Sequence, residues 1–302
     1  MAYNSIEKAV LSTCIYGDIF NFPLSKEELW AFLISTKKIE RESFEHALQT
    51  LCGQVLHQED GFYCLKGKEK SILKRKVNLP EVRRKLLLAK KAAYYLSYIP
   101  TIYFIGISGG VSVGNVAKQD DIDLFIIAKK KTLFITRLWI LALLELLDMR
   151  RKRHASGEGA QDKICVNLLI DESSLSWFGR RRDIYIAREI MQAKPLFERN
   201  GMYRKFLSAN QWARSFLLNA KAQSVPHRWN NNYHTIRFLW VIFASRPLEF
   251  LARVLQKHSI KKHQTTEVVS NATLAFHPHD YRKETLGLLG KSLKRFGILT
   301  NM

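Results

Sequence analysis

The sequence predicts an α+β fold of three units, at residues 1–68, 69–185 and 186–302, and three observations support this interpretation. The chain has 302 residues, more than one compact domain usually holds. Apolar residues make up 47% of it, which allows packed cores and excludes a wholly disordered or collagen-like chain. Apolar, strand-like runs in the second unit lie between two regions of helical periodicity.

The first unit, residues 1–68, predicts three helices followed by a hairpin. Ser25 and Glu28 form the reciprocal N-cap pattern that marks a helix start. Residues 41–52 predict the third helix, and Asp60-Gly61 suits a tight hairpin turn. This order of elements resembles a winged helix-turn-helix.

The winged-helix resemblance implies DNA binding, but the third helix has a mixed and rather acidic face, with Glu42 and Glu45 beside Arg41. We therefore favour a structural or protein-contact role for this unit, with a DNA-binding regulator as the alternative. The next segment, residues 66–91, holds eleven Lys or Arg residues and two acidic ones. It is either a solvated connector or a helix that lies over a phosphate backbone.

The charge of the whole chain indicates a polyanionic partner. Lys and Arg number 48 against 27 Asp and Glu, which leaves a net charge of +21 at pH 7. Such a surplus attracts nucleic acid, nucleotides or an anionic membrane surface. Basic clusters at residues 150–153 and 180–182 offer contacts to RNA or DNA, although complementing a helix dipole is the favoured role for the first cluster. The alternative for the whole surplus is a basic background that serves solubility alone.

Cysteine spacing and hydropathy predict a cytoplasmic protein without a membrane span. The four cysteines form no CxxC pair, which disfavours a zinc ribbon or a disulfide scaffold. The N-terminus lacks the pattern of a signal peptide. The longest apolar stretch, residues 133–149, contains three charged residues and is therefore a poor candidate for a membrane span. The sequence predicts no oligomeric state.

Residues 101–129 carry the pattern with chemical meaning. An apolar, β-rich run at residues 102–107 predicts a buried strand that ends in Ser108-Gly109-Gly110. Asp121 and Asp123 open a second strand, and the period of two places both carboxylates on one face. Two such carboxylates repel each other unless a cation lies between them, and glycine lets backbone N–H groups approach a phosphate. The segment therefore predicts a site for a metal ion and a triphosphate.

This pattern resembles the signature of the nucleotidyltransferase superfamily of DNA polymerase β, in which Gly-Gly or Gly-Ser is followed, after a spacer, by Asp-apolar-Asp. The resemblance covers residues 85–185, and the whole chain looks like a group of bacterial proteins that contain such a domain. It implies an enzyme that uses one or two Mg²⁺ ions to move a nucleoside monophosphate from an NTP to a hydroxyl acceptor, with RNA or DNA as a candidate acceptor. The implied catalytic and metal-binding residues are Asp121 and Asp123. The implied phosphate-binding residues are Ser108, Gly109, Gly110 and Ser112.

Active members of that superfamily add a third carboxylate from a later strand. The corresponding strand here, residues 163–170, carries Asn167 at its centre, and an amide oxygen can ligate a metal but cannot accept a proton. Asp171 lies further along the same face, by about 13 Å at the rise of a strand. Asp120, which precedes the pair, is expected to be solvated on the other face. The alternative function is therefore a degenerate member that binds nucleotide or nucleic acid without turnover.

The third unit predicts mainly helices. Helical periodicity runs over residues 183–256, and its tryptophans are expected in the core rather than stacked on bases. These tryptophans are Trp212, Trp229 and Trp240. Residues 277–280 contain two histidines and an aspartate, for which Pro278 favours a structural role over metal binding.

Overall fold

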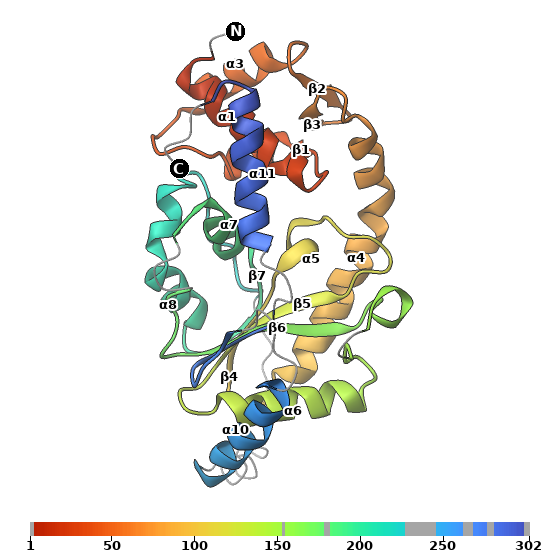
Figure 1. Cartoon of the computed structure of the whole chain (residues 1–302), viewed down its shortest axis with the longest axis vertical. Helices are drawn as coiled ribbons and strands as arrows, with labels where there is room; N and C mark the ends of the chain where they lie inside the picture. Colours follow the sequence, from red (N-terminus) through yellow and green to blue (C-terminus); the bar gives the residue numbers. More distant parts are fainter. Residues whose placement is uncertain are drawn as a thin grey trace.

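The computed structural model describes residues 3–152, 155–177, 182–226, 246–261, 268–276 and 281–298. Within these residues the protein is α+β, as predicted (Figure 1). A mixed six-stranded sheet, in the order β7-β4-β5-β6-β9-β8, forms the centre. A second, three-stranded sheet, in the order β1-β3-β2, belongs to the N-terminal region.

The N-terminal region has the predicted order of helices and hairpin. Its elements are α1 (Ser5–Ile19), β1 (Leu24–Ser25), α2 (Lys26–Ala31), α3 (Arg41–Leu51), β2 (Leu56–Glu59) and β3 (Phe62–Leu65). The predicted helix start is confirmed, because the Ser25 hydroxyl accepts the Glu28 N–H at 3.2 Å and the Glu28 carboxylate accepts the Ser25 N–H at 2.8 Å. Asp60 and Gly61 both have positive φ and form the hairpin turn. DNA binding by this region stays a prediction.

The basic segment after the hairpin forms one long helix, α4 (Lys70–Leu96), which joins the N-terminal region to the central sheet (Figure 1). Part of its positive charge is used internally. Near its start Arg75 pairs with Glu28 at 2.7 Å, and in its middle the buried Lys85 binds the loop that precedes β5. Much of the basic charge of this segment therefore holds the two parts of the chain together.

The central sheet is built mainly from the middle of the chain. Its first elements are β4 (Ile102–Ile107), α5 (Gly109–Val113), β5 (Ile122–Ala128), α6 (Leu133–Leu146) and β6 (Ile164–Asp171). They are followed by α7 (Ile184–Gln192), β7 (Lys194–Glu198), α8 (Met202–Ala209), α10 (Arg246–Lys261), β8 (Val268–Val269), β9 (Thr273–Ala275) and α11 (Tyr281–Arg295). Short 3₁₀ turns cover Gly157–Gly159 and Gln211–Ser215. β4 is antiparallel to β5 and to β7, whereas β5 and β6 are parallel.

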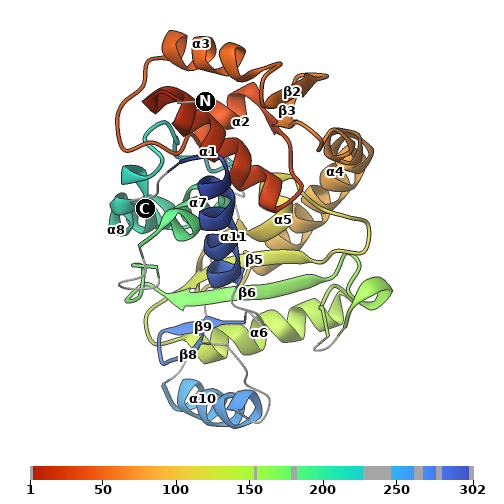
Figure 2. The same cartoon turned by 45° about the horizontal axis from the view of Figure 1, so that its top comes forward.

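Helices cover both faces of this sheet (Figure 2). α4, α6 and α10 lie on one face, and α7, α8, α11 and the N-terminal region lie on the other. Alternation along β5 separates the two cores, since Leu124 and Ile126 face the first set of helices while Phe125 and Ile127 face the second. Within the described residues, no helix combines the length and the apolar character needed to cross a membrane.

The C-terminal region departs from the helical prediction in one respect, because β7, β8 and β9 join the central sheet. These strands have two to five residues, too few to produce a readable alternation, and β7 also contains Pro195. Trp212 is half-buried against Phe216, with ring centroids 6.1 Å apart. The predictions for Trp229, Trp240 and residues 277–280 lie outside the described residues.

Candidate metal and phosphate site

The glycine turn after β4 lies directly against a carboxylate. The Ser108 N–H donates to the carbonyl of Asp123 at 3.0 Å, which extends the pairing of β4 with β5. Gly109 has a φ of +62°, and a Cβ atom on it would lie 2.7 Å from Asp123 Oδ2. A Cβ atom on Gly110 would lie 2.6 Å from the Asn115 carbonyl oxygen. Gly109 is therefore needed for the backbone to pass close to Asp123, and Gly110 is needed for it to pass close to the Asn115 carbonyl.

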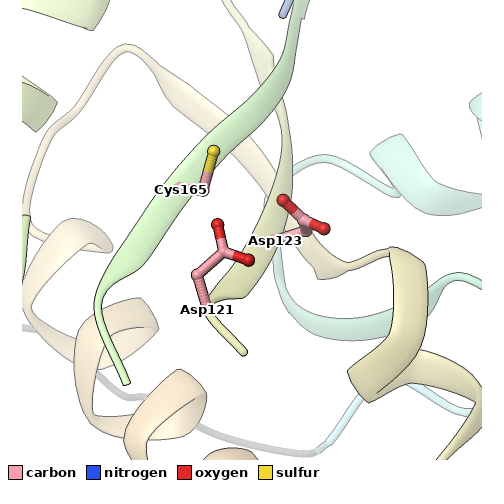
Figure 3. A group of neighbouring side chains, drawn as sticks. All are labelled: Asp121, Asp123 and Cys165. Atoms are coloured by element: carbon pink, nitrogen blue, oxygen red, sulfur yellow. The ribbon is translucent and has the colours of Figure 1, made fainter. Parts of the chain in front are cut away.

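Three metal-ligating side chains gather on neighbouring strands. Asp121 and Asp123 come from the start of β5, on the same face as predicted, and Cys165 comes from β6 (Figure 3). One ligand atom from each lies within 4.8 Å of the others. The parallel register pairs Asp123 with Cys165, so this cysteine is the β6 residue that lies directly beside the carboxylate pair.

Asn167, the predicted third ligand, lies two residues beyond Cys165. Leu124 pairs with Val166 and Phe125 pairs with Leu168. This register shift leaves Asn167, which lies between Val166 and Leu168, without a partner residue on β5. The backbone carbonyl of Asn167 accepts the N–H of Phe276, the residue after β9, at 2.9 Å. The superfamily pattern predicts an acid on this strand, whereas the residue beside the carboxylate pair is a cysteine. Parallel pairing of the two strands was the signal that would have found it.

Asp171 is not part of the cluster. It pairs with Ala128 at the far end of β6 and is almost fully buried. Its carboxylate accepts the N–H of Lys131 at 3.1 Å and the N–H of Ser173 at 2.9 Å. It therefore ties two turns together at the opposite end of the strand.

A guanidinium group lies among the three ligands. Arg151 Nη1 is 3.0 Å from Asp121 Oδ2 and donates to Cys165 Sγ at 3.7 Å. Arg151 Nη2 donates to the Ala155 carbonyl at 3.2 Å, which holds the side chain in the loop between α6 and β6. The basic cluster at residues 150–153, to which this arginine belongs, was expected to complement a helix dipole or to contact nucleic acid, whereas Arg151 contacts Asp121 and Cys165.

Burial and like charge shift the acid–base properties of the site. Burial, followed by the neighbouring charge of Asp121, raises the pKa of Asp123 to about 7. Burial and the same two carboxylates raise the pKa of the Cys165 thiol. Without an added cation the cysteine is therefore a neutral thiol at neutral pH. A divalent cation would favour the ionised form of all three groups.

One further carboxylate, Glu189 of α7, acts on this region through its charge. The charge of Glu189 contributes to the raised pKa of Asp123, and burial raises the pKa of Glu189 itself to about 7. No sequence pattern indicates this residue, because its influence on Asp123 depends on how α7 packs over the sheet.

The serines of the turn differ in their hydrogen bonding. Ser112 is buried, and its hydroxyl donates to the Gly109 carbonyl at 2.7 Å. Ser108 is only 5% exposed, and its hydroxyl has no hydrogen-bond partner among the described residues. Since Ser108 lies opposite Asp123 in an antiparallel pair, both side chains lie on the same face of the sheet.

Lys85 of α4 holds the loop that leads into Asp121 and β5. Its buried ammonium donates to the Lys118 carbonyl at 3.1 Å, to the Asp120 carbonyl at 2.5 Å and to the Asp162 carboxylate at 2.8 Å. The Asp120 side chain is exposed, as predicted, and accepts the Ala117 N–H at 2.7 Å. Lys85 thus positions the residues immediately before Asp121 without touching the site itself.

The side chains of the cluster suit a divalent cation. Two carboxylates offer the oxygen donors that Mg²⁺ prefers, and the unpaired Ser108 hydroxyl offers a further oxygen on the same face. The sulfur of Cys165 is a softer donor, which Mg²⁺ does not select. The residues present therefore form a candidate metal site of mixed donor type.

Comparison with known proteins adds little to this geometry. No protein-family model matches the chain, and no curated protein matches it. A solved structure of a toxin–antitoxin with AMP-PNP has 19% sequence identity to this chain, with 42% of this chain and 90% of that chain covered. Its TM-score is 0.25, so this similarity establishes neither a shared fold nor a function.

Proposed function

We propose that the protein is a metal-dependent nucleotidyltransferase, which binds an NTP and transfers its nucleoside monophosphate to a hydroxyl acceptor. The close approach of Gly109 to Asp123 carries this proposal, because even a Cβ atom on this glycine would lie only 2.7 Å from a carboxylate oxygen of the candidate metal pair. A phosphate bound along such a turn lies within reach of a cation held by Asp121 and Asp123.

Each part of the site has a role in this proposal. Asp121 and Asp123 hold Mg²⁺, as one or two ions, which when bound neutralises triphosphate charge and stabilises the transferring phosphoryl group. The turn at Ser108, Gly109 and Gly110 binds phosphate oxygens, with the Ser108 hydroxyl as a donor. Ser112 supports the turn through its bond to the Gly109 carbonyl.

Proton transfer from the acceptor needs a base, and Glu189 is our candidate. Its pKa of about 7 suits proton acceptance at neutral pH, and its charge reaches Asp123. RNA or DNA is the acceptor class that the net charge of +21 favours. The catalytic unit in this proposal is residues 69–185, flanked by residues 1–68 and 186–302.

A second candidate function is nucleotide binding without transfer. It is favoured by Cys165, which stands beside Asp123 where a third carboxylate would assist catalysis, and by Arg151, which is paired with Asp121. In this case the same turn and carboxylates bind the NTP, and no pyrophosphate is released.

The test is incubation of the full chain with each labelled NTP and Mg²⁺, with and without bulk RNA. The Asp121→Asn/Asp123→Asn double variant should lose label transfer, whereas the exposed neighbour variant Asp120→Asn should keep it. Magnesium-dependent nucleotide binding without transfer would favour the second candidate. Nucleotide binding that is unchanged in the double variant would overturn both.

A further inference from the structure

Cys165 gives the cluster a donor that a magnesium site does not need. We propose that Asp121, Asp123 and Cys165 together bind a divalent transition-metal cation, of the Zn²⁺ and Co²⁺ class, through two oxygens and one sulfur. This inference rests on the proposed function and changes one part of it, because the site then selects a transition metal in place of the Mg²⁺ named there.

The spacing of the donors fits one ion. Zn–O and Zn–S bonds are about 2.0 to 2.3 Å long, so two ligands of one ion stand no more than about 4.6 Å apart. The three donor atoms here all lie within 4.8 Å of one another before any ion draws them in. Cys165 is the partner of Asp123 in the sheet, so the approach of its sulfur is set by strand pairing and not by a loop.

One observation independent of the three ligands points to a bound cation at this place. The Ser108 hydroxyl is buried and unpaired among the described residues, on the same face as Asp123, and it is suited to a fourth ligand position or to a metal-bound water. The guanidinium of Arg151 contacts Asp121 and Cys165, so a bound metal ion would take its place beside these two donors.

The chemistry of sulfur decides the choice of metal. Thiolate ligands favour Zn²⁺, Co²⁺ and similar ions, whereas Mg²⁺ takes oxygen ligands almost exclusively. On binding, the S–H bond of Cys165 is replaced by a sulfur–metal bond and its proton leaves to solvent. Arg151 is then released from Asp121 and becomes available to a phosphate of the nucleotide.

Co²⁺ titration of the full chain tests this inference, because a cobalt–thiolate bond produces a charge-transfer absorption in the near ultraviolet. We expect this band in the wild type and in the Cys52→Ser control, whose half-buried cysteine lies in the N-terminal region. We expect no band in Cys165→Ser, with Co²⁺ affinity at least about tenfold lower. A band of wild-type intensity in Cys165→Ser, or Co²⁺ binding to the wild type without a band, would overturn the inference.

A second variant, Cys165→Asp, tests the same idea by gain of function. Three carboxylates form an oxygen-only site, so the ratio of Co²⁺ to Mg²⁺ affinity should fall by at least about tenfold relative to the wild type. An unchanged ratio would count against selection by sulfur.

The outcomes also separate this inference from the proposed function. Mg²⁺-dependent NMP transfer by a wild type that shows no cobalt–sulfur band would remove the inference and leave the function. A cobalt–sulfur band in a protein that binds no NTP with any of these metals would confirm the metal site and remove the function.

Discussion

Two helices on opposite faces of the central sheet bury charged groups, and the surroundings of those charges differ. On α4, Lys85 is fully buried and has three oxygen partners, including the carboxylate of Asp162. On α7, Arg188 is buried and donates to the Phe32 carbonyl at 3.1 Å, and it stacks on Tyr16 with its Cζ 4.2 Å from the ring centroid. Burial lowers the pKa of Arg188 to about 10.

The next residue of α7 follows the same pattern, because burial raises the pKa of Glu189 to about 7. On α4, the charge of Lys85 is therefore paired with Asp162, and Lys85 holds the loop before Asp121. On α7, burial disfavours the charged forms of Arg188 and Glu189. Perturbed groups of this second kind are typical of functional sites, and Glu189 is the one whose charge reaches Asp123. The comparison indicates that α4 supports the site and that α7 contributes to it.

The largest loss of stability should come from removing the charge of Lys85. We expect Lys85→Met to lower the free energy of unfolding by about 3–5 kcal/mol, because it leaves two partly buried carbonyl groups without their donor and leaves Asp162 paired with Arg84 alone. Urea denaturation measures this loss. Lys90→Met, at an exposed position of the same helix, should change stability by less than about 0.5 kcal/mol. Equal losses in the two variants would show that the Lys85 network contributes little.

A smaller effect, dependent on pH, should come from Glu189. Its pKa in the folded protein is about 7 against an ordinary 4.5, so the folded state retains the proton longer as pH rises. Stability is therefore lost progressively between these two values, and the loss is complete above pH 7. We expect Glu189→Gln to be more stable than the wild type at pH 8, by at most about 3 kcal/mol, and equally stable near pH 4.

Unfolding by urea at a series of pH values tests this expectation, with the exposed Glu42→Gln as the control. A difference between Glu189→Gln and the wild type that stays constant from pH 4 to pH 8 would contradict it, since only a titrating group produces the change. Label transfer in the same variant then tests the role of Glu189 as the proposed base, because Gln cannot accept the proton.

A substitution in the glycine turn should cause a moderate loss of stability and a large loss of nucleotide binding. Gly109→Ala places a Cβ atom 2.7 Å from the Asp123 carboxylate at a φ of +62°, and we expect a cost of about 2 kcal/mol with loss of metal-dependent nucleotide binding. Gly53→Ala is the matched control, because Gly53 has a φ of +81° and no atom near its Cβ position. It should lose about 1 kcal/mol and keep binding. Retained binding in Gly109→Ala would separate the turn from the metal pair.

The features of the site that could be predicted from the sequence are those that depend on residues close together in the chain. The strand before Ser108, the glycine turn and the spacing of Asp121 and Asp123 all follow from residue types close together in the chain. Cys165 reaches the site through the register of a parallel pair, which the alternation of β6 alone does not define. Arg151 and Glu189 reach it through a loop and through helix packing, and neither leaves a periodic signal in the sequence.

The smallest effect should come from the uncompensated arginine of α7. Arg188→Met removes one hydrogen bond and the stacking on Tyr16, but it also removes a buried charge, so we expect a net loss of only about 1 kcal/mol. Arg188→Lys should lose more than Arg188→Met, because lysine keeps the charge and cannot stack as a planar guanidinium does. Urea denaturation of both variants gives the ranking. If Arg188→Met lost as much unfolding free energy as Lys85→Met, the partners of Arg188 would stabilise its charge as well as those of Lys85 do. The contrast between α4 and α7 would then have no energetic basis.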